Sequence, residues 1–380
     1  MALIYSCDLN PLQSQIPGSQ WVLEPVVAGL DTVFTYSRAT AFGSSSSLYA
    51  GTRGDIEAGS LIRFEMPDSL TVANTLSAEL YIFPKDTNLV TGNFYLDLVQ
   101  DLETPWAEGD TGLTLSKFAG SVPIDTSRIV DSTVGYFIST TVRDSADIAH
   151  VKFSINPLIL QNWKSANVAN NGFLVTTDDN LSLFSFYSSY SIKNPYLLIE
   201  YTLSDTDTTV YRGFLKPTHD TYVINNNSSA SNDGLQLSFV QGKRVHIDFS
   251  NQFIPEIERP VAGGRLTLFK DEISEINGAN VTLYVLSRIR EYSALDDTSF
   301  TVIRSVSMPA TADSLVISIS GFLQDVLTGG KDNFGIDLLV NPLYNDFDQL
   351  VFHDSLATVG LRPRLEILYA TPYATEEGND

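Results

Sequence analysis

Short stretches in which apolar and polar residues alternate recur along almost the whole chain. Examples are residues 61–66, 78–83 and 94–99, and each stretch is bounded by Gly, Pro, Asn, Asp or Ser. Such alternation between turn-forming residues is typical of β-strands. Only residues 156–163 and 320–327 have a helical pattern, and both are brief. The pattern predicts an all-β chain with minor short helices.

The two helical segments belong to an internal repeat. In the first copy Leu160 lies twelve residues before Gly172, and in the second copy Leu323 lies twelve residues before Gly335. In both copies the Gly opens an apolar strand. The same spacing at two distant places in the chain indicates that one structural unit occurs twice.

Further pairs of segments keep the same order in both copies. They are 31–33 with 220–223, 62–64 with 247–249, 80–83 with 266–269, and the closing pattern Pro-x-Leu-x-Ile-x-Tyr at 195–201 with 363–369. Convergence on generic strand patterns seldom produces several anchors in one order. We therefore predict two copies of one domain.

The repeat sets the predicted organisation of the chain. It comprises an N-terminal tether (1–20), a first domain (21–202), a short polar linker (203–208), a second domain (209–371) and an acidic tail (372–380). Many short strands with long connections favour a jelly-roll β-sandwich for each domain. Pro at the start of a closing strand fits this fold, because its missing N–H costs no ladder hydrogen bond there.

The composition favours an extracellular protein and disfavours nucleic acid as a partner. Only 18% of the 380 residues are charged, Ser, Thr and Asn are frequent, and the formal net charge is −22. Because an acidic surface repels phosphate backbones, we expect no nucleic-acid partner.

Acidic side chains also allow a structural Ca²⁺. The candidate ligands follow corresponding strands of the two copies and are Asp178, Asp179, Asp346 and Asp348. Asp and Asn also favour turns, so a turn-forming role is the alternative for these positions.

The chain contains one cysteine, Cys7, so it forms no internal disulfide. Residues 4–7 resemble the end of a bacterial lipobox, which makes Cys7 a candidate lipid anchor on the cell surface. An ordinary terminal cysteine is the alternative, since the apolar run 2–5 is too short for the core of a signal peptide. No run reaches 18 apolar residues, so we expect no transmembrane segment.

The order of motifs resembles the DNRLRE-type domain of secreted bacterial and archaeal proteins. In the first copy the matching residues are Asp31, Thr32, Val33, Leu61, Ile62, Arg63, Phe64, Ser77, Ala78, Glu79, Leu80, Trp106, Glu108, Asn171, Gly172, Pro195, Leu197, Ile199 and Tyr201. The resemblance implies a jelly-roll sandwich of the kind grouped with carbohydrate-binding modules. Some members of that family bind acidic polysaccharides such as alginate.

The second copy departs further from that pattern. Tyr292 stands near the position of Trp106, and 246–249 replaces Leu-Ile-Arg-Phe. The Ser-Arg-Glu-like stretch before the closing strand is absent from both copies. The matching motifs are mostly structural, and a net charge of −22 disfavours a polyanionic sugar unless Ca²⁺ bridges the two.

No catalytic motif is present. The four histidines form no i, i+4 pair or His-x-His set, and no Gly-x-Ser-x-Gly occurs. Sugar binding needs exposed flat rings with polar neighbours, and the candidates are Tyr187, Tyr190, Tyr344 and Trp106. For Trp106 the alternative is packing beneath the edge of the sandwich.

These observations favour a non-catalytic secreted or cell-surface protein that binds carbohydrate or serves in adhesion or the extracellular matrix. The alternative is a structural subunit of a stalk, layer or filament that associates with copies of itself. A polysaccharide lyase or hydrolase with an unmarked site is a third hypothesis.

Overall fold

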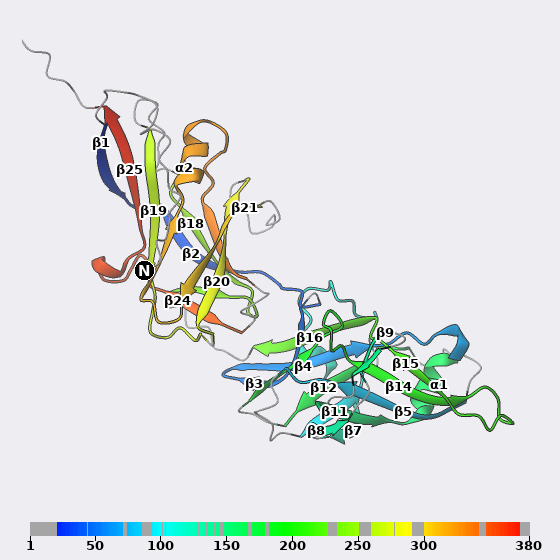
Figure 1. Cartoon of the computed structure of the whole chain (residues 1–380). Helices are drawn as coiled ribbons and strands as arrows, with labels where there is room; N and C mark the ends of the chain where they lie inside the picture. The colour runs from blue at the N-terminus through cyan, green and yellow to red at the C-terminus, as the bar shows by residue number, and fades with distance from the viewer. Residues whose placement is uncertain are drawn as a thin grey trace, which may run out of the picture. The chain divides into compact units, whose positions relative to one another are not determined.

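The computed structural model describes residues 21–372 apart from several short segments. Those segments are 44, 71–73, 86–92, 101, 103, 128, 134–135, 140–141, 145–146, 166–168, 179–181, 227–233, 251–259, 277, 291–299 and 342–346. The chain forms two compact units (Figure 1). Unit 1 comprises residues 1–38 and 231–380, and unit 2 comprises residues 39–230.

Unit 2 is a β-sandwich built from one continuous stretch of chain. Its elements are β3 (Ser47–Arg53), β4 (Ile56–Arg63), η1 (Asp68–Leu70), β5 (Asn74–Ile82), β6 (Phe94–Leu98), η2 (Leu115–Phe118), β7 (Val122–Ser127), β8 (Ile129–Thr133), β9 (Tyr136–Ser139), β10 (Val142–Asp144), β11 (Asp147–Ile155), α1 (Pro157–Lys164), β12 (Phe173–Thr177), β13 (Leu183–Tyr187), β14 (Tyr196–Thr202), β15 (Tyr211–Leu215) and β16 (His219–Asn226). One sheet has the order β15-β14-β5-β11-β8, and the other has the order β13-β3-β4-β12-β6-β7 with β16 paired to β4. Strands β9 and β10 form a separate pair.

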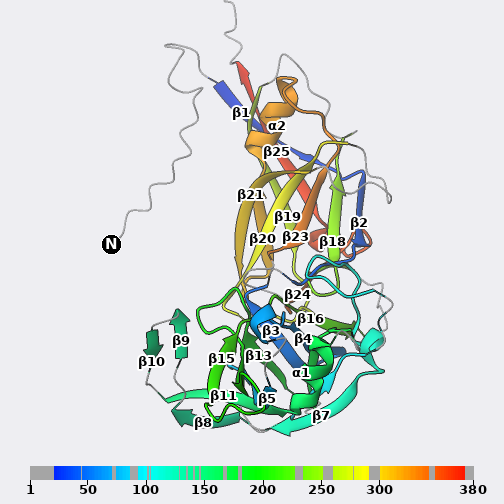
Figure 2. The same ribbon diagram turned by 90° about the vertical axis from the view of Figure 1, so that its right-hand side faces the viewer.

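Unit 1 repeats this arrangement with strands from both ends of the chain. Its elements are β1 (Trp21–Ala28), β2 (Thr32–Ser37), β17 (Leu235–Ser238), β18 (Lys243–Asp248), β19 (Val261–Phe269), β20 (Asn280–Arg288), β21 (Phe300–Pro309), β22 (Ser314–Ser318), α2 (Ser320–Leu327), β23 (Ile336–Val340), β24 (Gln349–Phe352), η3 (Val359–Leu361) and β25 (Arg364–Pro372). One sheet is β1-β25-β19-β22, and the other is β21-β20-β23-β18-β17-β24 with β2 paired to β18. Figure 2 shows β20, β23 and β18 as successive neighbours.

Apart from β8, β9 and β10, which are additional in unit 2, the strands of the two units follow the same order, which confirms the predicted all-β sandwich fold. In each unit alternate residues of both sheets point inward and form a single core. Leu80 and Leu197 meet Ile62 and Phe173 in the core of unit 2. The two predicted helices are α1 and α2, and each lays a fully buried Leu, Leu160 or Leu323, into the core of its unit.

The opening strands of the two copies are exchanged. β1 pairs with β25 from Trp21↔Pro372 to Ala28↔Leu365, and β2 pairs with β18 from Thr32↔Asp248 to Ser37↔Lys243. In Figure 1 these blue strands lie among the yellow to red strands of unit 1. The same places in unit 2 are filled by β15, which pairs with β14, and β16, which pairs with β4. Each sandwich is thus completed by the opening strands of the other copy.

This exchange corrects the predicted domain boundaries. Residues 21–38 lie in unit 1, and residues 209–230 lie in unit 2, together with the predicted linker 203–208. The physical reason is that an opening strand pairs with the edge strand of a sheet. Both units have edge strands with the same alternation of apolar and polar residues. Period-two alternation does not specify which of the two rims a strand occupies.

The strand registers also correct one of the matched segment pairs of the repeat, 31–33 with 220–223. Ile62 and Ile247 are equivalent, because they lie opposite Phe173 and Ile336 at the starts of β12 and β23. Asp220 lies opposite Ile62, whereas Val33 lies opposite Ile247. Segment 31–33 is therefore offset by two residues from the match with 220–223 that the sequence predicts. A shift of two keeps every side chain on the same face, so alternation alone does not detect it.

The repeated glycines Gly172 and Gly335 have the same geometry in both units. Their φ angles are +80° and +79°. A Cβ would lie 2.4 Å from the Ile62 carbonyl oxygen at Gly172 and 2.5 Å from the Ile247 carbonyl oxygen at Gly335. Only glycine accommodates both the left-handed backbone and this close approach.

We predict that Gly172→Ala and Gly335→Ala each lower the free energy of unfolding by at least about 2 kcal/mol, because each adds backbone strain to a steric clash. Urea unfolding monitored by tryptophan fluorescence measures the change. Gly120→Ala is the control, since φ there is not positive and nothing lies within 4 Å of the added Cβ. Equal stability of all three variants and the parent would contradict this account.

Candidate functional site

The turn after β13 in unit 2 is fixed to the neighbouring chain by serine hydrogen bonds. Ser188 Oγ donates to the carbonyl oxygen of Ser45, and Ser191 Oγ donates to that of Ser46, at 2.8 and 3.0 Å. Ser189 lies between them and faces the exchanged strand β16. These hydrogen bonds fix the backbone of the turn, so an exposed side chain such as Tyr190 projects from a rigid turn.

Asp220 of β16 is the buried anchor of this turn, with 1% of its surface exposed. Its carboxylate accepts hydrogen bonds from Ser189 N at 2.6 Å and Ser189 Oγ at 2.8 Å. Burial raises the pKa of Asp220 to about 6, opposed by the Ser189 hydrogen bonds and reinforced by the negative charge of Glu108. Glu108 Oε1 also accepts the backbone N–H of Asp220 at 2.8 Å.

Tyr190 and Tyr187 present rings at this turn. Tyr190 is 61% exposed, and its hydroxyl donates to Glu108 Oε2 at 2.7 Å, a hydrogen bond that raises the pKa of the phenol. The ammonium groups of Lys85 and Lys193 lie 5.5 and 5.8 Å from the centre of the Tyr187 ring. The structure thus brings the predicted Tyr187 and Tyr190 to one edge, where Tyr190 offers a flat ring in a fixed orientation.

Trp106 lies near this edge but is only 2% exposed, so its prediction as a sugar platform is wrong. Its indole N–H donates to the Asn171 carbonyl oxygen at 2.8 Å. The Arg63 guanidinium lies 5.2 Å from the ring centre and donates to the Trp106 carbonyl oxygen at 3.0 Å. The guanidinium of Arg63 therefore packs on the indole ring of Trp106. This agrees with the alternative given for Trp106 in the sequence analysis, that it packs beneath the edge of the sandwich.

Trp106 belongs to an apolar cluster on the outer face of the seven-stranded sheet of unit 2. The buried members are Leu61, Val99, Trp106, Leu115, Phe118, Leu174 and Val223. Four of them come from the sheet or the end of β6. The others come from residues 106–118, a long connection between β6 and β7 that covers the face.

Unit 1 carries charged and polar side chains at the equivalent positions. His246 lies opposite Asp337 between β18 and β23, as Leu61 lies opposite Leu174 between β4 and β12. By the same registers Tyr36 and Arg288 take the places of Val223 and Val99. Equivalent strand positions therefore form an apolar cluster in unit 2 and a polar network in unit 1.

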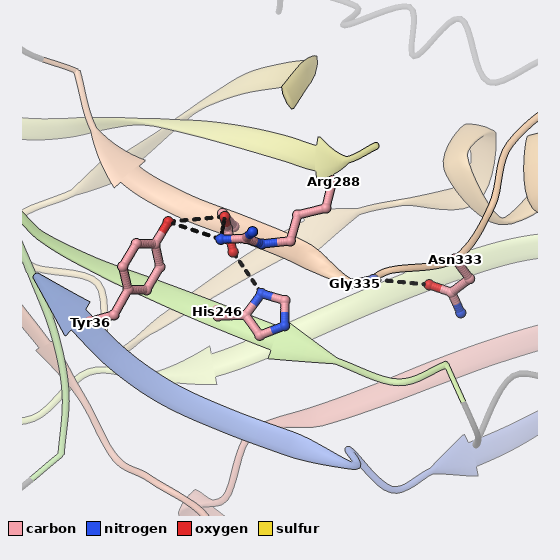
Figure 3. A network of polar contacts seen from close by, with 6 residues as sticks. Tyr36, His246, Arg288, Asn333 and Gly335 are labelled. Atoms are coloured by element: carbon pink, nitrogen blue, oxygen red, sulfur yellow. Dashed lines mark hydrogen bonds and ion pairs between the residues drawn. The ribbon is translucent and has the colours of Figure 1, made fainter. Parts of the chain in front are cut away.

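The network converges on the carboxylate of Asp337, as Figure 3 shows. His246 Nδ1 lies 2.7 Å from Oδ1, Arg288 Nη2 lies 2.8 Å from Oδ2, and the Tyr36 hydroxyl donates to Oδ2 at 3.0 Å. Asp337, His246 and Arg288 are 0, 3 and 4% exposed. A buried charge persists only when it is paired and hydrogen-bonded. Here the pairing connects four strands, β2, β18, β20 and β23.

A cleft of about 390 Å³ in unit 1 lies between β2, β17 and the turn after β24. It is lined by Val33, Phe34, Thr35, Gly234, Leu235, Gln236, Lys243, Asp354, Ser355 and Leu356. Its volume lies in the range of small-molecule sites. The lining residues include apolar ones and ones that carry hydroxyl, amide, ammonium and carboxylate groups.

The equivalent place in unit 2 is filled. The registers make Thr35 equivalent to Tyr222, and Gln236 equivalent to Tyr49. Tyr222 is fully buried, its ring stacks on Phe42 with centres 4.5 Å apart, and the Tyr49 ring meets it edge-on at 4.9 Å. At these two positions unit 1 has smaller residues than unit 2, and among the described residues a cleft remains where unit 2 places two aromatic rings.

The turn beside the cleft shows the same difference. Ser355 and Leu356 are equivalent to Ser189 and Tyr190. Ser189 bonds to Asp220, whereas Ser355 lies near Val33, the residue at the position of Asp220. The cleft therefore opens where unit 2 has a buried carboxylate and its hydrogen bonds.

Each of the two predicted metal sites has one ligand among the described residues, Asp178 in unit 2 and Asp348 in unit 1. Asp178 accepts hydrogen bonds from Asn93 Nδ2 at 3.1 Å and the Tyr95 hydroxyl at 2.8 Å, and these bonds lower its pKa. Asp348 is buried. In the described part of the chain no group of three His, Cys, Asp or Glu side chains is arranged to hold a metal. Four predicted site residues, Cys7, Asp179, Tyr344 and Asp346, lie outside the described residues.

No family model, curated protein or solved structure matches this chain. The resemblance to DNRLRE-type domains stays a prediction, and the functional argument rests on the geometry of the chain itself. Neither described α-helix has the length and apolar character that crossing a membrane requires.

We predict that Asp220→Asn removes one source of pH dependence from the stability of unit 2. The native pKa of about 6 lies above the ordinary 3.8, so the native state holds this proton more tightly than the unfolded chain. As pH rises from about 4 through about 6, ionisation of Asp220 lowers the free energy of unfolding by roughly 3 kcal/mol. Urea titrations at pH 4, 5, 6 and 7.5 should show this loss in the parent and a smaller loss in Asp220→Asn.

Asp178→Asn is the matched control, because the pKa of Asp178 is lowered and its effect on stability has the opposite sign. Parallel stability curves for Asp220→Asn and the parent across this pH range would contradict the assignment.

We predict that Asp337→Leu, which introduces the residue of the equivalent position Leu174, costs about 3–5 kcal/mol of stability, because Arg288 then loses its buried counter-charge. Differential scanning calorimetry measures the shift. Asp313→Leu, on a turn of the same unit, is the control and should change stability by less than about 0.5 kcal/mol. A loss no larger than that of the control would show that the network contributes little.

Proposed function

We propose that this protein is a non-catalytic binding protein that holds a carbohydrate in the cleft of unit 1. The observation that carries the proposal is the cleft itself, which is open in unit 1 and filled by aromatic side chains at the equivalent place in unit 2. Unit 1 has smaller residues at the equivalent positions, Thr35 in place of Tyr222 and Gln236 in place of Tyr49. Space for a ligand is a physical reason for that difference.

The chemistry of the walls supports a hydroxylated ring. Val33, Phe34 and Leu356 are the apolar members of the lining on this side, and Thr35, Gln236 and Ser355 carry groups that both donate and accept hydrogen bonds. Lys243 and Asp354 add one charge of each sign. The local charge is therefore balanced within a chain of net charge −22, which favours a neutral glycan over a polyanionic one.

The secreted or cell-surface setting, and a role in adhesion or the extracellular matrix, belong to the same proposal. The supporting observation is the composition, which is rich in short polar side chains and strongly acidic. The Tyr190 ring of unit 2 is a second place where a sugar could stack, and its position on a separate unit allows the two places to be tested apart.

We expect a glycan array to identify a neutral oligosaccharide, and titration calorimetry to measure its affinity. Gln236→Ala and Lys243→Ala should each weaken binding about tenfold, the loss of one good hydrogen bond. Thr35→Tyr, which places the residue of unit 2 into the cleft, should abolish binding. Because it also removes the hydroxyl that accepts the Gln236 backbone N–H at 2.8 Å, its unfolding midpoint is measured alongside to show that the variant is folded at the temperature of the titration.

Tyr190→Ala is the control and should leave the affinity unchanged. A loss of binding in Tyr190→Ala alone would move the site to unit 2. Absence of binding to every glycan of a broad array would overturn the proposal.

A further inference from the structure

The segment that completes unit 1 belongs to a different part of the chain from the rest of that unit. Residues 21–37, named here the closing segment, contain β1 and β2. At Arg38 the chain leaves unit 1 and enters unit 2, and it returns only at Ser231. The closing segment therefore stays in unit 1 through non-covalent contacts. In unit 2 the corresponding strands, β15 and β16, lie within one continuous stretch of chain.

The closing segment is less buried than its counterpart. None of the six residues of β2 is buried, whereas five of the eight residues of β16 are. β1 does not differ in this way from its counterpart β15, since Leu23 and Val27 of β1 are 45 and 67% exposed, and Tyr211 and Phe214 of β15 are 37 and 40% exposed. The difference in burial lies in β2. Because fewer apolar contacts hold an element, its local opening requires less free energy. The closing segment is thus the more easily released of the two.

The contacts of the closing segment are also well suited to exchange between molecules. β1 contributes eight register pairs with β25, and β2 contributes six with β18. Tyr36 adds its hydrogen bond to Asp337, and the Phe34 ring lies 5.2 Å from the ring of His246. The segment of a second copy carries the same residues and would make the same contacts, so exchange needs no new interface.

We propose that the closing segment is a self-association element, and that residues 21–37 of one copy complete unit 1 of a second copy of this chain. Backbone pairing supplies the affinity, and Tyr36 against Asp337 fixes the register. Within one molecule the connection after Arg38 keeps the segment at a high effective concentration, so closure within the molecule prevails in dilute solution. Exchange prevails when copies are concentrated or fold together. This proposal does not rest on carbohydrate binding, although Val33, Phe34 and Thr35 of the closing segment also line the cleft, so an exchanged segment brings this wall of the cleft from the second copy.

A mixed-cysteine experiment tests the proposal on the full chain. Two single variants, Ser37→Cys and Lys243→Cys, are made in a Cys7→Ser background, since Ser37 and Lys243 are register partners of β2 and β18. In the mixture only an exchanged segment brings the two cysteines opposite each other. The proteins are mixed, unfolded in urea, refolded together at low and at high concentration, and oxidised. Non-reducing electrophoresis and mass spectrometry then quantify the disulfide-linked heterodimer.

Glu57→Cys mixed with Asn225→Cys is the matched control, because these positions pair β4 with β16 inside one continuous stretch. We expect the heterodimer of the Ser37→Cys and Lys243→Cys variants to increase with protein concentration, and the control mixture to give only background heterodimer. Heterodimer at the level of the control at every concentration would overturn the proposal. Equal, abundant heterodimer in both mixtures would also overturn it, since that result indicates association without exchange.

Discussion

Each sandwich in this protein depends on a strand pair that the other copy of the repeat provides. A jelly roll is complete only when its first strands cover the rim beside its last strand, because open rims expose backbone donors and acceptors together with part of the core. In unit 2 this cover is β15 and β16, and β16 buries Tyr222, Val223 and Asp220. In unit 1 this cover is β1 and β2, so the first described strand of the chain pairs with the last, β25.

The same frame supports opposite chemistry in its two copies. Four equivalent positions on the outer face hold Leu61, Val99, Leu174 and Val223 in unit 2. In unit 1 they hold His246, Arg288, Asp337 and Tyr36. In unit 2 this face is covered by apolar residues of 106–118, from the connection after β6. Strand pairing and core alternation tolerate either solution, because the outward positions do not enter the core.

The sequence was sufficient to predict those parts of the fold that depend on local patterns. Alternation predicts the strands, Leu160 and Leu323 mark the two helices, and Gly172 and Gly335 mark identical turns. The exchange of opening strands was not predictable, because a strand pattern specifies a face and not a partner. The two-residue offset of the opening anchor escaped detection for the same reason.

The functional residues divide similarly. Tyr187 and Tyr190 are close in the chain and were predicted together, and Tyr190 is exposed. Trp106 is buried by a connection whose path no local pattern gives. His246 and Asp337 lie 91 residues apart, so their pairing requires the register of β18 with β23. The sequence does show a polar residue within each of these apolar strands, His246 in one and Asp337 in the other. This marks both residues as unusual, but it does not show that they pair with each other. The cleft became visible only when equivalent positions of the two units were compared.

The strand exchange is the claim on which this account of the protein depends. Nuclear Overhauser effects between backbone protons of β2 and its neighbouring strand test it directly in a dilute, isotope-labelled sample. The account predicts cross-strand effects from residues 32–37 to residues 243–248. Effects from residues 32–37 to residues 58–63 of β4 would show instead that each copy closes on its own opening strand, and would contradict it.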